Sequence, residues 1–166
     1  AGSYNPNSST LNSIYTPNAA ELAAGSVTLT LTSSANGNCI AGTDVVVINF
    51  TDPPSVNAGI DLSVCKNNAA AVLSGLVSGT STTGVWSGGL GTFNPNNGVL
   101  TATYTPSASE IATGIVTLTL TSTNNSNCNA VTDVVQINLT NEPVVNAGAD
   151  IFACENNINS VLTGVV

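Results

Sequence analysis

The chain repeats itself at an offset of 89 residues, with no gap in the correspondence. The segment 15–39, YTPNAAELAAGSVTLTLTSSANGNC, returns as YTPSASEIATGIVTLTLTSTNNSNC at 104–128. TDVVVIN at 43–49 returns as TDVVQIN at 132–138. More than half of the positions are identical along the whole correspondence. A period of this length predicts a tandem array of similar folded units.

The period leaves two ways of dividing the chain into units. In the first, residues 1–53 are the C-terminal part of a repeat, 54–142 one complete repeat and 143–166 the N-terminal part of the next. In the second, 1–77 and 90–166 are equivalent pieces. Because the chain begins and ends within a unit in the first division, we expect it to be a window on a longer array.

Two segments of each repeat alternate apolar and polar residues. Residues 116–120 and 135–139 have this period of two, which predicts strands with one buried face. An Asn- and Ser-rich stretch separates them, so we expect a hairpin with a long loop. Their copies are residues 27–31 and 46–50, further strands are expected at 72–77 and 84–86, and Asn97-Gly98 predicts a tight turn.

A single helical turn is predicted between the strands. Ser107 and Glu110 have the spacing of a capping box, and Gly114 is placed to end the turn. The copy keeps this chemistry with Asn18, Glu21 and Gly25. Glu110 and Glu21 are therefore interpreted as helix caps rather than catalytic acids.

The aromatic residues complete the predicted fold. Trp86, the only tryptophan, is expected to fill the core. Tyr15 and Tyr104 are also assigned to the core, where their hydroxyls are expected to anchor a corner. The fold class predicted is all-β, with tandem Ig-like β-sandwich repeats of about seven strands and one short helical turn in each.

Charge is scarce and negative. Only 6% of the residues are charged, Lys66 is the only cation, and the net charge is −8. Such a chain repels nucleic acid, so no nucleic-acid partner is expected. No apolar run approaches the roughly 20 residues that span a bilayer, so no membrane insertion is expected.

The four cysteines recur at the repeat offset. Without any His or Cys-x-x-Cys, a zinc site is improbable, and disulfides in an oxidising compartment are the preferred interpretation. One connectivity joins Cys65 to Cys128 within a unit. The other, slightly preferred, joins Cys39 to Cys65 and Cys128 to Cys154, because each pair straddles a proline-containing turn.

The repeated acids are weak candidates for a metal site. Asp61, Asp150, Asp44 and Asp133 could serve a calcium ion, but their spacing matches no known calcium loop, and turn formation is the favoured role. No cofactor is otherwise expected. Without His or a nucleophile elbow, no catalytic residue is assigned, and we expect no enzymatic activity.

The run VNAGIDLSVC … VLSG … GVWSGGLGTFNPNNGVLTATYTPSASEIATGIVTLTLTS … C … TDVVQINL resembles the Ig-like repeats of giant Bacteroidetes cell-surface proteins, among them gliding-motility adhesins. The resemblance covers the whole chain. It implies an extracellular protein at the cell surface whose repeats form a long filament or stalk, and it implies no catalytic residues. Expected partners are neighbouring repeats and, in adhesion, surface polysaccharide or other cells. The alternative is a carbohydrate-binding module of a secreted protein.

Overall fold

The two segments with alternating apolar residues form the two longest strands of a computed structural model that describes residues 1–166. β12 (Ile115–Thr123) and β13 (Thr132–Thr140) pair antiparallel, with Val116 opposite Ile137 and Leu118 opposite Val135. Their alternating apolar side chains all face one side and are buried. The predicted hairpin is therefore confirmed, and it is the centre of the unit Pro54–Val166.

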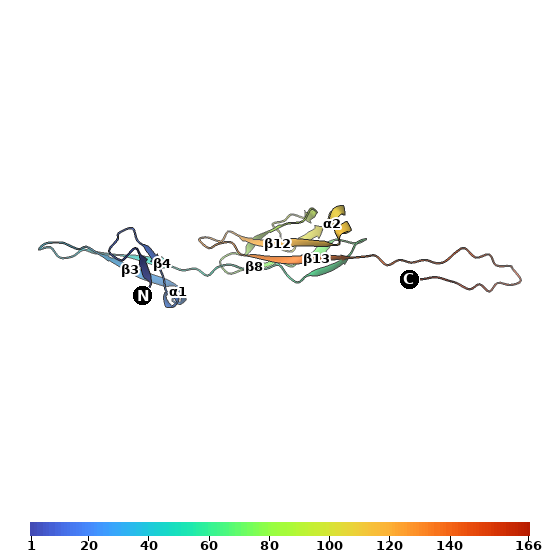
Figure 1. Ribbon diagram of the computed structural model, residues 1–166, viewed down its shortest axis with the longest axis horizontal. Coiled ribbons are helices and arrows are strands. Elements are labelled where there is room, and N and C mark those ends of the chain that lie inside the picture. Colours follow the sequence, from blue (N-terminus) through green and yellow to red (C-terminus); the bar gives the residue numbers. More distant parts are fainter. The chain divides into compact units, whose positions relative to one another are not determined.

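Two further strands extend this hairpin into a four-stranded sheet with the order β6-β13-β12-β9. β9 (Thr83–Ser87) is antiparallel to β12, and β6 (Leu62–Cys65) is parallel to β13. Figure 1 shows β12 and β13 side by side, with α2 (Ala108–Thr113) near one end of the hairpin.

Shorter strands cover the apolar face of this sheet. The remaining strands are β5 (Ser55–Asn57), β7 (Ala71–Val72), β8 (Leu76–Ser78), β10 (Thr92–Asn94) and β11 (Thr103–Thr105). They form a three-stranded sheet, β10-β11-β7, and a two-stranded sheet, β5-β8. The expected strand over 72–77 is thus two short strands, which pair with different partners. The expected turn at Asn97-Gly98 is present within the β10–β11 connection.

The core of this unit is built around aromatic and branched side chains that are almost fully enclosed. Trp86 and Tyr104 are both 0% exposed, which confirms the prediction that they are buried. The other members are Ala58, Ala71, Leu73, Val77, Val116, Leu118, Leu120, Val135, Ile137 and Leu139. Burial of this apolar surface is the main source of stability that the unit has.

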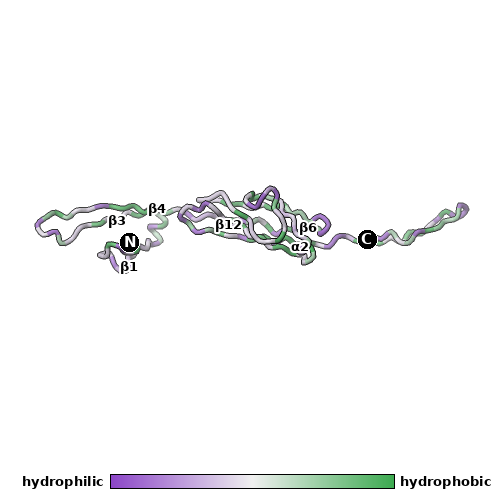
Figure 2. The backbone as a smooth tube through the Cα atoms, turned by 90° about the horizontal axis from the view of Figure 1, so that it is seen from above, coloured by the Kyte–Doolittle hydropathy of each residue, from purple (hydrophilic) through white to green (hydrophobic).

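The unit Ala1–Pro53 repeats part of this architecture. β1 (Ser3–Asn5) pairs with β2 (Ile14–Thr16), and β3 (Ser26–Thr32) pairs with β4 (Thr43–Asn49). α1 (Ala19–Ala23) lies between the two hairpins in the chain. In Figure 2 hydrophobic residues predominate along β3 and β4.

The division at Pro53 and Pro54 is the first boundary of the first division predicted from the repeat. Residues 54–77 contribute β5 and β6, which pack with β12 and β13. The structure therefore does not divide the chain into a unit of residues 1–77. Strands account for 40% of the residues and helices for only 7%, which agrees with the predicted all-β class.

Candidate functional site

A cluster of hydrogen-bonded polar groups lies where α2 begins. Both bonds of the predicted capping box are present: the Ser107 hydroxyl accepts from Glu110 N, and the Glu110 carboxylate accepts from Ser107 N at 2.7 Å. Gly114 ends the helix with a φ of 86°, the left-handed conformation that glycine adopts at low cost. The residues that sequence analysis assigned to capping therefore have that role.

The second carboxylate oxygen of Glu110 ties the helix to the sheet. It accepts hydrogen bonds from the Tyr104 hydroxyl and from Leu90 N, both at 2.8 Å. The Tyr104 hydroxyl in turn accepts from Gly91 N at 2.8 Å. We call Tyr104, Glu110 and the amides of Leu90 and Gly91 the tyrosine–glutamate corner.

Burial and hydrogen bonding shift the pKa values at this corner in opposite directions. Burial, together with the bond to Glu110, raises the pKa of Tyr104 to about 12. Burial alone would raise the pKa of Glu110 as well. The hydrogen bonds that Glu110 accepts from Ser107, Leu90 and Tyr104 outweigh that effect and hold its pKa below the ordinary value. The corner therefore holds a carboxylate and a neutral phenol, with no group poised to exchange protons near neutral pH.

The first unit contains the same corner in a more open form. The Tyr15 hydroxyl donates to Glu21 at 2.8 Å, and both groups accept from Gly2 N at 3.1 Å. Asn18 and Glu21 form the second predicted capping box. Tyr15 is only half-buried, unlike Tyr104, so its assignment to a closed core is wrong in this unit. The ring centroids of Tyr15 and Tyr4 are 4.9 Å apart, as are those of their counterparts Tyr104 and Phe93.

The sequence predicts turn formation for the repeated acids. In the complete repeat Asp61 and Asp133 have a different role. Asp133 accepts from Ala58 N at 2.8 Å, and Asp61 accepts from Gln136 N at 2.9 Å. Both bonds join residues 75 positions apart, so these acids fasten residues 58–61 to β13. Asp44 bonds only its neighbour Val45, and Asp150 lies in the C-terminal segment. Nowhere do three or more His, Cys, Asp or Glu side chains gather in a way that could hold a metal ion.

Cys65 and Cys128 lie at opposite ends of the four-stranded sheet. Cys65 pairs with Thr140 at the end of β13, and Cys128 lies in the loop before Thr132, where β13 starts. The nine residues of β13 span about 26 Å. Cys65 and Cys128 are thus at opposite ends of the unit, whereas a disulfide needs Cα atoms about 4–7 Å apart. The structure contains no disulfide, and the pairings Cys39–Cys65 and Cys128–Cys154 stay predictions.

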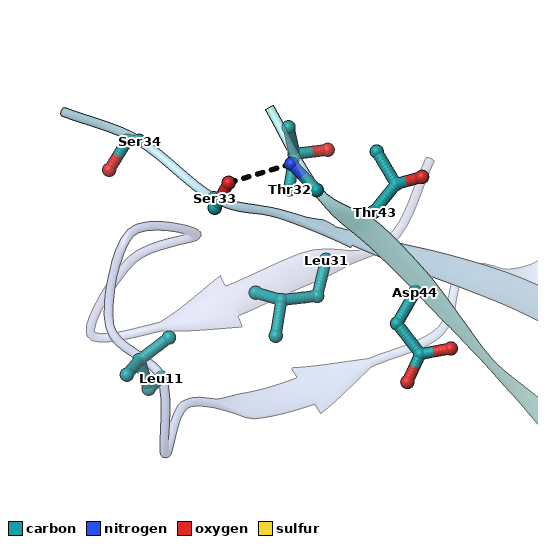
Figure 3. A pocket seen from close by; sticks show the side chains of 8 residues that line it. Leu11, Leu31, Thr32, Ser33, Ser34, Thr43 and Asp44 are labelled. Atoms are coloured by element: carbon teal, nitrogen blue, oxygen red, sulfur yellow. Dashed lines mark hydrogen bonds between the residues drawn. The ribbon is translucent and has the colours of Figure 1, made fainter. Parts of the chain in front are cut away.

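An open pocket of about 550 Å³ lies in the first unit. Figure 3 shows Leu11, from the β1–β2 connection, and Leu31, from β3, beside it. A hydrogen bond from Gly42 N to the Ser33 hydroxyl, 2.9 Å long, closes one end of the β3–β4 hairpin above the two leucines. The sequence of residues 1–53 does not predict this pocket. The equivalent residues of the second unit are of the same types and lie in or against its core.

The pocket corresponds by the repeat to the place that Trp86 fills in the complete unit. The counterparts of Leu11 and Leu31 are Leu100 and Leu120. The Trp86 indole donates to the Leu100 carbonyl at 3.2 Å, and Trp86 lies opposite Leu120 across the β9–β12 pair. The pocket is therefore the surface of a core that lacks the strand which carries the tryptophan in the complete repeat.

Comparison with known proteins adds no identity. No protein-family model matches the chain, and no curated protein matches it. None of the helices has the length and apolar character needed to cross a membrane.

Proposed function

We propose that the chain is a structural or adhesive segment of a long extracellular surface protein, in which tandem Ig-like β-sandwich repeats act as a rigid stalk. The observation that carries this proposal is the recurrence of one framework in both units. The register of the hairpin, the helix capping box and the 2.8 Å hydrogen bond from tyrosine to glutamate all recur at the 89-residue offset. What recurs between the two units is a set of structural hydrogen bonds rather than a cluster of reactive groups. This supports a structural role for the repeat.

The path of the chain through the complete repeat suits end-to-end stacking. Ala58 is bonded to Asp133 at the start of β13, and the chain leaves β13 at Thr140. The first and last parts of the repeat thus run in the same direction, and the chain enters and leaves at opposite ends. Units connected in this way add about 26 Å or more of length each.

The alternative, a carbohydrate-binding module, has less support. Sugar rings stack on exposed aromatic faces, and aromatic residues are 4% of this chain. Trp86 and Tyr104, which would have favoured this function if exposed, are both enclosed in the core.

The proposal is tested on intact cells of the source organism with antibodies raised against the chain. Labelling of unbroken cells, lost after brief protease treatment from outside, is the expected result. Labelling only after lysis would contradict the proposal. Glycan-array binding at micromolar concentration or better, by the chain itself, would favour the carbohydrate-binding alternative.

A further inference from the structure

The chain contains two Asn-Gly pairs, Asn36-Gly37 and Asn97-Gly98. In such a pair the backbone nitrogen of the glycine can attack the side-chain amide carbon of the asparagine, because no Cβ obstructs its approach. In a folded protein the reaction also requires that this nitrogen and the side-chain amide are free to move. The two pairs differ in both respects.

Asn97-Gly98, in the β10–β11 connection, is fastened at both reacting groups. Asn97 Nδ2 donates to the Trp86 carbonyl at 3.0 Å, and the Asn97 carbonyl accepts from Trp86 N at 2.8 Å. Trp86 itself is enclosed in the core. The attacking atom, Gly98 N, donates to Asn96 Oδ1 at 2.9 Å. Attack on the Asn97 side chain would break bonds to both Trp86 and Asn96, so the fold protects this pair.

Asn36-Gly37, in the β3–β4 loop, is held more loosely. Asn36 Nδ2 donates to the Ser33 carbonyl at 3.1 Å, an exposed bond within the same loop, and the Asn36 carbonyl accepts from Cys39 N at 3.0 Å. The hydrogen bonds of the loop leave Gly37 N without an acceptor. Gly37 is exposed, and a methyl group in place of its hydrogen would meet no atom within 4 Å. Gly37 N therefore has room to approach the Asn36 side chain.

The β12–β13 loop of the complete repeat has the same conformation, with Ser126 in the place of Gly37. The angle φ is 54° at Ser126 and 59° at Gly37. Asn125, the counterpart of Asn36, makes the two corresponding hydrogen bonds at 3.2 and 3.0 Å. Asn125 is half-buried and Ser126 is exposed, as are Asn36 and Gly37. The loop thus has the same form in both units, and the two copies differ in the residue that follows the asparagine.

We propose that Asn36 is a site of spontaneous modification, at which Gly37 N displaces the side-chain amide as ammonia. Gly37 N gives its proton to hydroxide and forms a bond to Asn36 Cγ. The Cγ–Nδ2 bond breaks, and Nδ2 takes a proton from water and leaves as ammonia. The product is a cyclic succinimide. Water then adds to one of its two carbonyl carbons and breaks the bond from that carbon to the ring nitrogen.

The ring opens in two ways. Breaking the bond at Cγ leaves aspartate at position 36, and breaking the bond at the main-chain carbonyl leaves isoaspartate, in which the backbone runs through Cβ. Either product adds one negative charge to a chain whose net charge is −8. Either also removes the donor that bonds the Ser33 carbonyl. The inference rests on the two loops and does not depend on the proposed function.

The first experiment compares the folded and the urea-unfolded chain during incubation at mildly alkaline pH, with peptic peptide mapping by mass spectrometry. In the folded chain Asn36 should be converted to both isoaspartate and aspartate, at a rate that rises with pH, while Asn97 stays intact. In urea both pairs should react. A folded chain in which Asn36 stays intact, or in which Asn97 reacts as fast as Asn36, would overturn the proposal. So would aspartate as the sole product, because direct hydrolysis without the ring gives no isoaspartate.

Reciprocal substitutions test the role of the glycine within one loop conformation. Gly37→Ser should slow conversion of Asn36 about tenfold, which equals a rise of about 1.4 kcal/mol in the activation free energy. Ser126 already has this backbone conformation, so the loop accommodates the serine. Ser126→Gly should make Asn125 react at a rate close to that of Asn36 in the wild type.

A readout of folding accompanies the second substitution. The urea midpoint of Trp86 fluorescence should show that Ser126→Gly leaves the unit Pro54–Val166 folded. Reaction of Asn125 in that folded chain supports the proposal. An intact Asn125 in the folded Ser126→Gly chain would contradict it, as would a Gly37→Ser chain in which Asn36 reacts as fast as in the wild type.

Discussion

Replacement of Tyr104 by Phe removes one hydroxyl from the centre of the tyrosine–glutamate corner. The hydroxyl donates to the Glu110 carboxylate and accepts from Gly91 N, each at 2.8 Å, and Tyr104 is 0% exposed. Glu110 keeps its bonds from Leu90 and Ser107, but Gly91 N loses its acceptor, the Tyr104 hydroxyl. A bond to a charged group contributes about 1.5–3 kcal/mol, and an unsatisfied buried amide costs about 1–3 kcal/mol. Since neighbouring groups relax, we expect a loss of about 2–3 kcal/mol.

The assay follows from the position of the only tryptophan. Trp86 belongs to the unit Pro54–Val166, so its fluorescence during urea unfolding follows that unit alone. With a slope of about 1–3 kcal/mol per molar urea, the midpoint should fall by about 0.7–3 M. Tyr15→Phe removes the equivalent hydroxyl from the other unit and is the matched control, because it should leave the Trp86 transition unchanged. A Tyr104→Phe midpoint within error of the wild type would refute the reasoning.

Three further predictions concern the same corner. Because the pKa of Glu110 is lowered by folding, its contribution to stability is present above its ordinary value of 4.5 and is lost as pH falls below it; Glu110→Gln should flatten this acid limb of the urea midpoint. Because the pKa of Tyr104 is raised from 10.0 to about 12, stability should fall as pH rises from the lower to the higher value, and in a spectrophotometric titration Tyr104→Phe should remove the last phenol to ionise. Gly91→Ala places a methyl group against the Thr105 carbonyl and the Tyr104 ring, and should lower the free energy of unfolding in urea by about 1–3 kcal/mol. Gly98→Ala is the control, because the nearest neighbour of its methyl group is a side-chain oxygen at 3.2 Å. It should change the free energy of unfolding by less than about 0.5 kcal/mol.

The local features of this fold could be predicted because their causes are local. Alternation of Val, Leu and Thr specifies a strand with one apolar face, and this is why the β12–β13 hairpin was predicted correctly. The capping boxes at Ser107 and Asn18 depend on residues three positions apart. Even the tyrosine–glutamate corner joins side chains only six positions apart.

The features that were missed depend on partners far along the chain. Nothing near Asp61 or Asp133 indicates that each bonds an amide 75 residues away, so turn formation was the wrong role for both. The parallel pairing of β6 with β13 has no local signal either. Leu31 and Leu120 lie in the same sequence context, yet one is exposed and the other enclosed. The burial of a side chain depends on the segments that pack over it, and these cannot be identified from the residue and its neighbours in the sequence.

The parallel pairing of β6 with β13 has a mechanical consequence for a protein anchored at both ends. Residues 58–65 run alongside residues 133–140 in the same direction, bonded through Asp133, Asp61 and the β6–β13 ladder. Tension on the two ends of the repeat pulls the first segment one way and the second the other way, along their common axis. The bonds between them are then strained together in shear, and none can open before its neighbours. A repeat with this pairing should yield to a pulling force far less readily than one whose terminal strands could be peeled apart bond by bond.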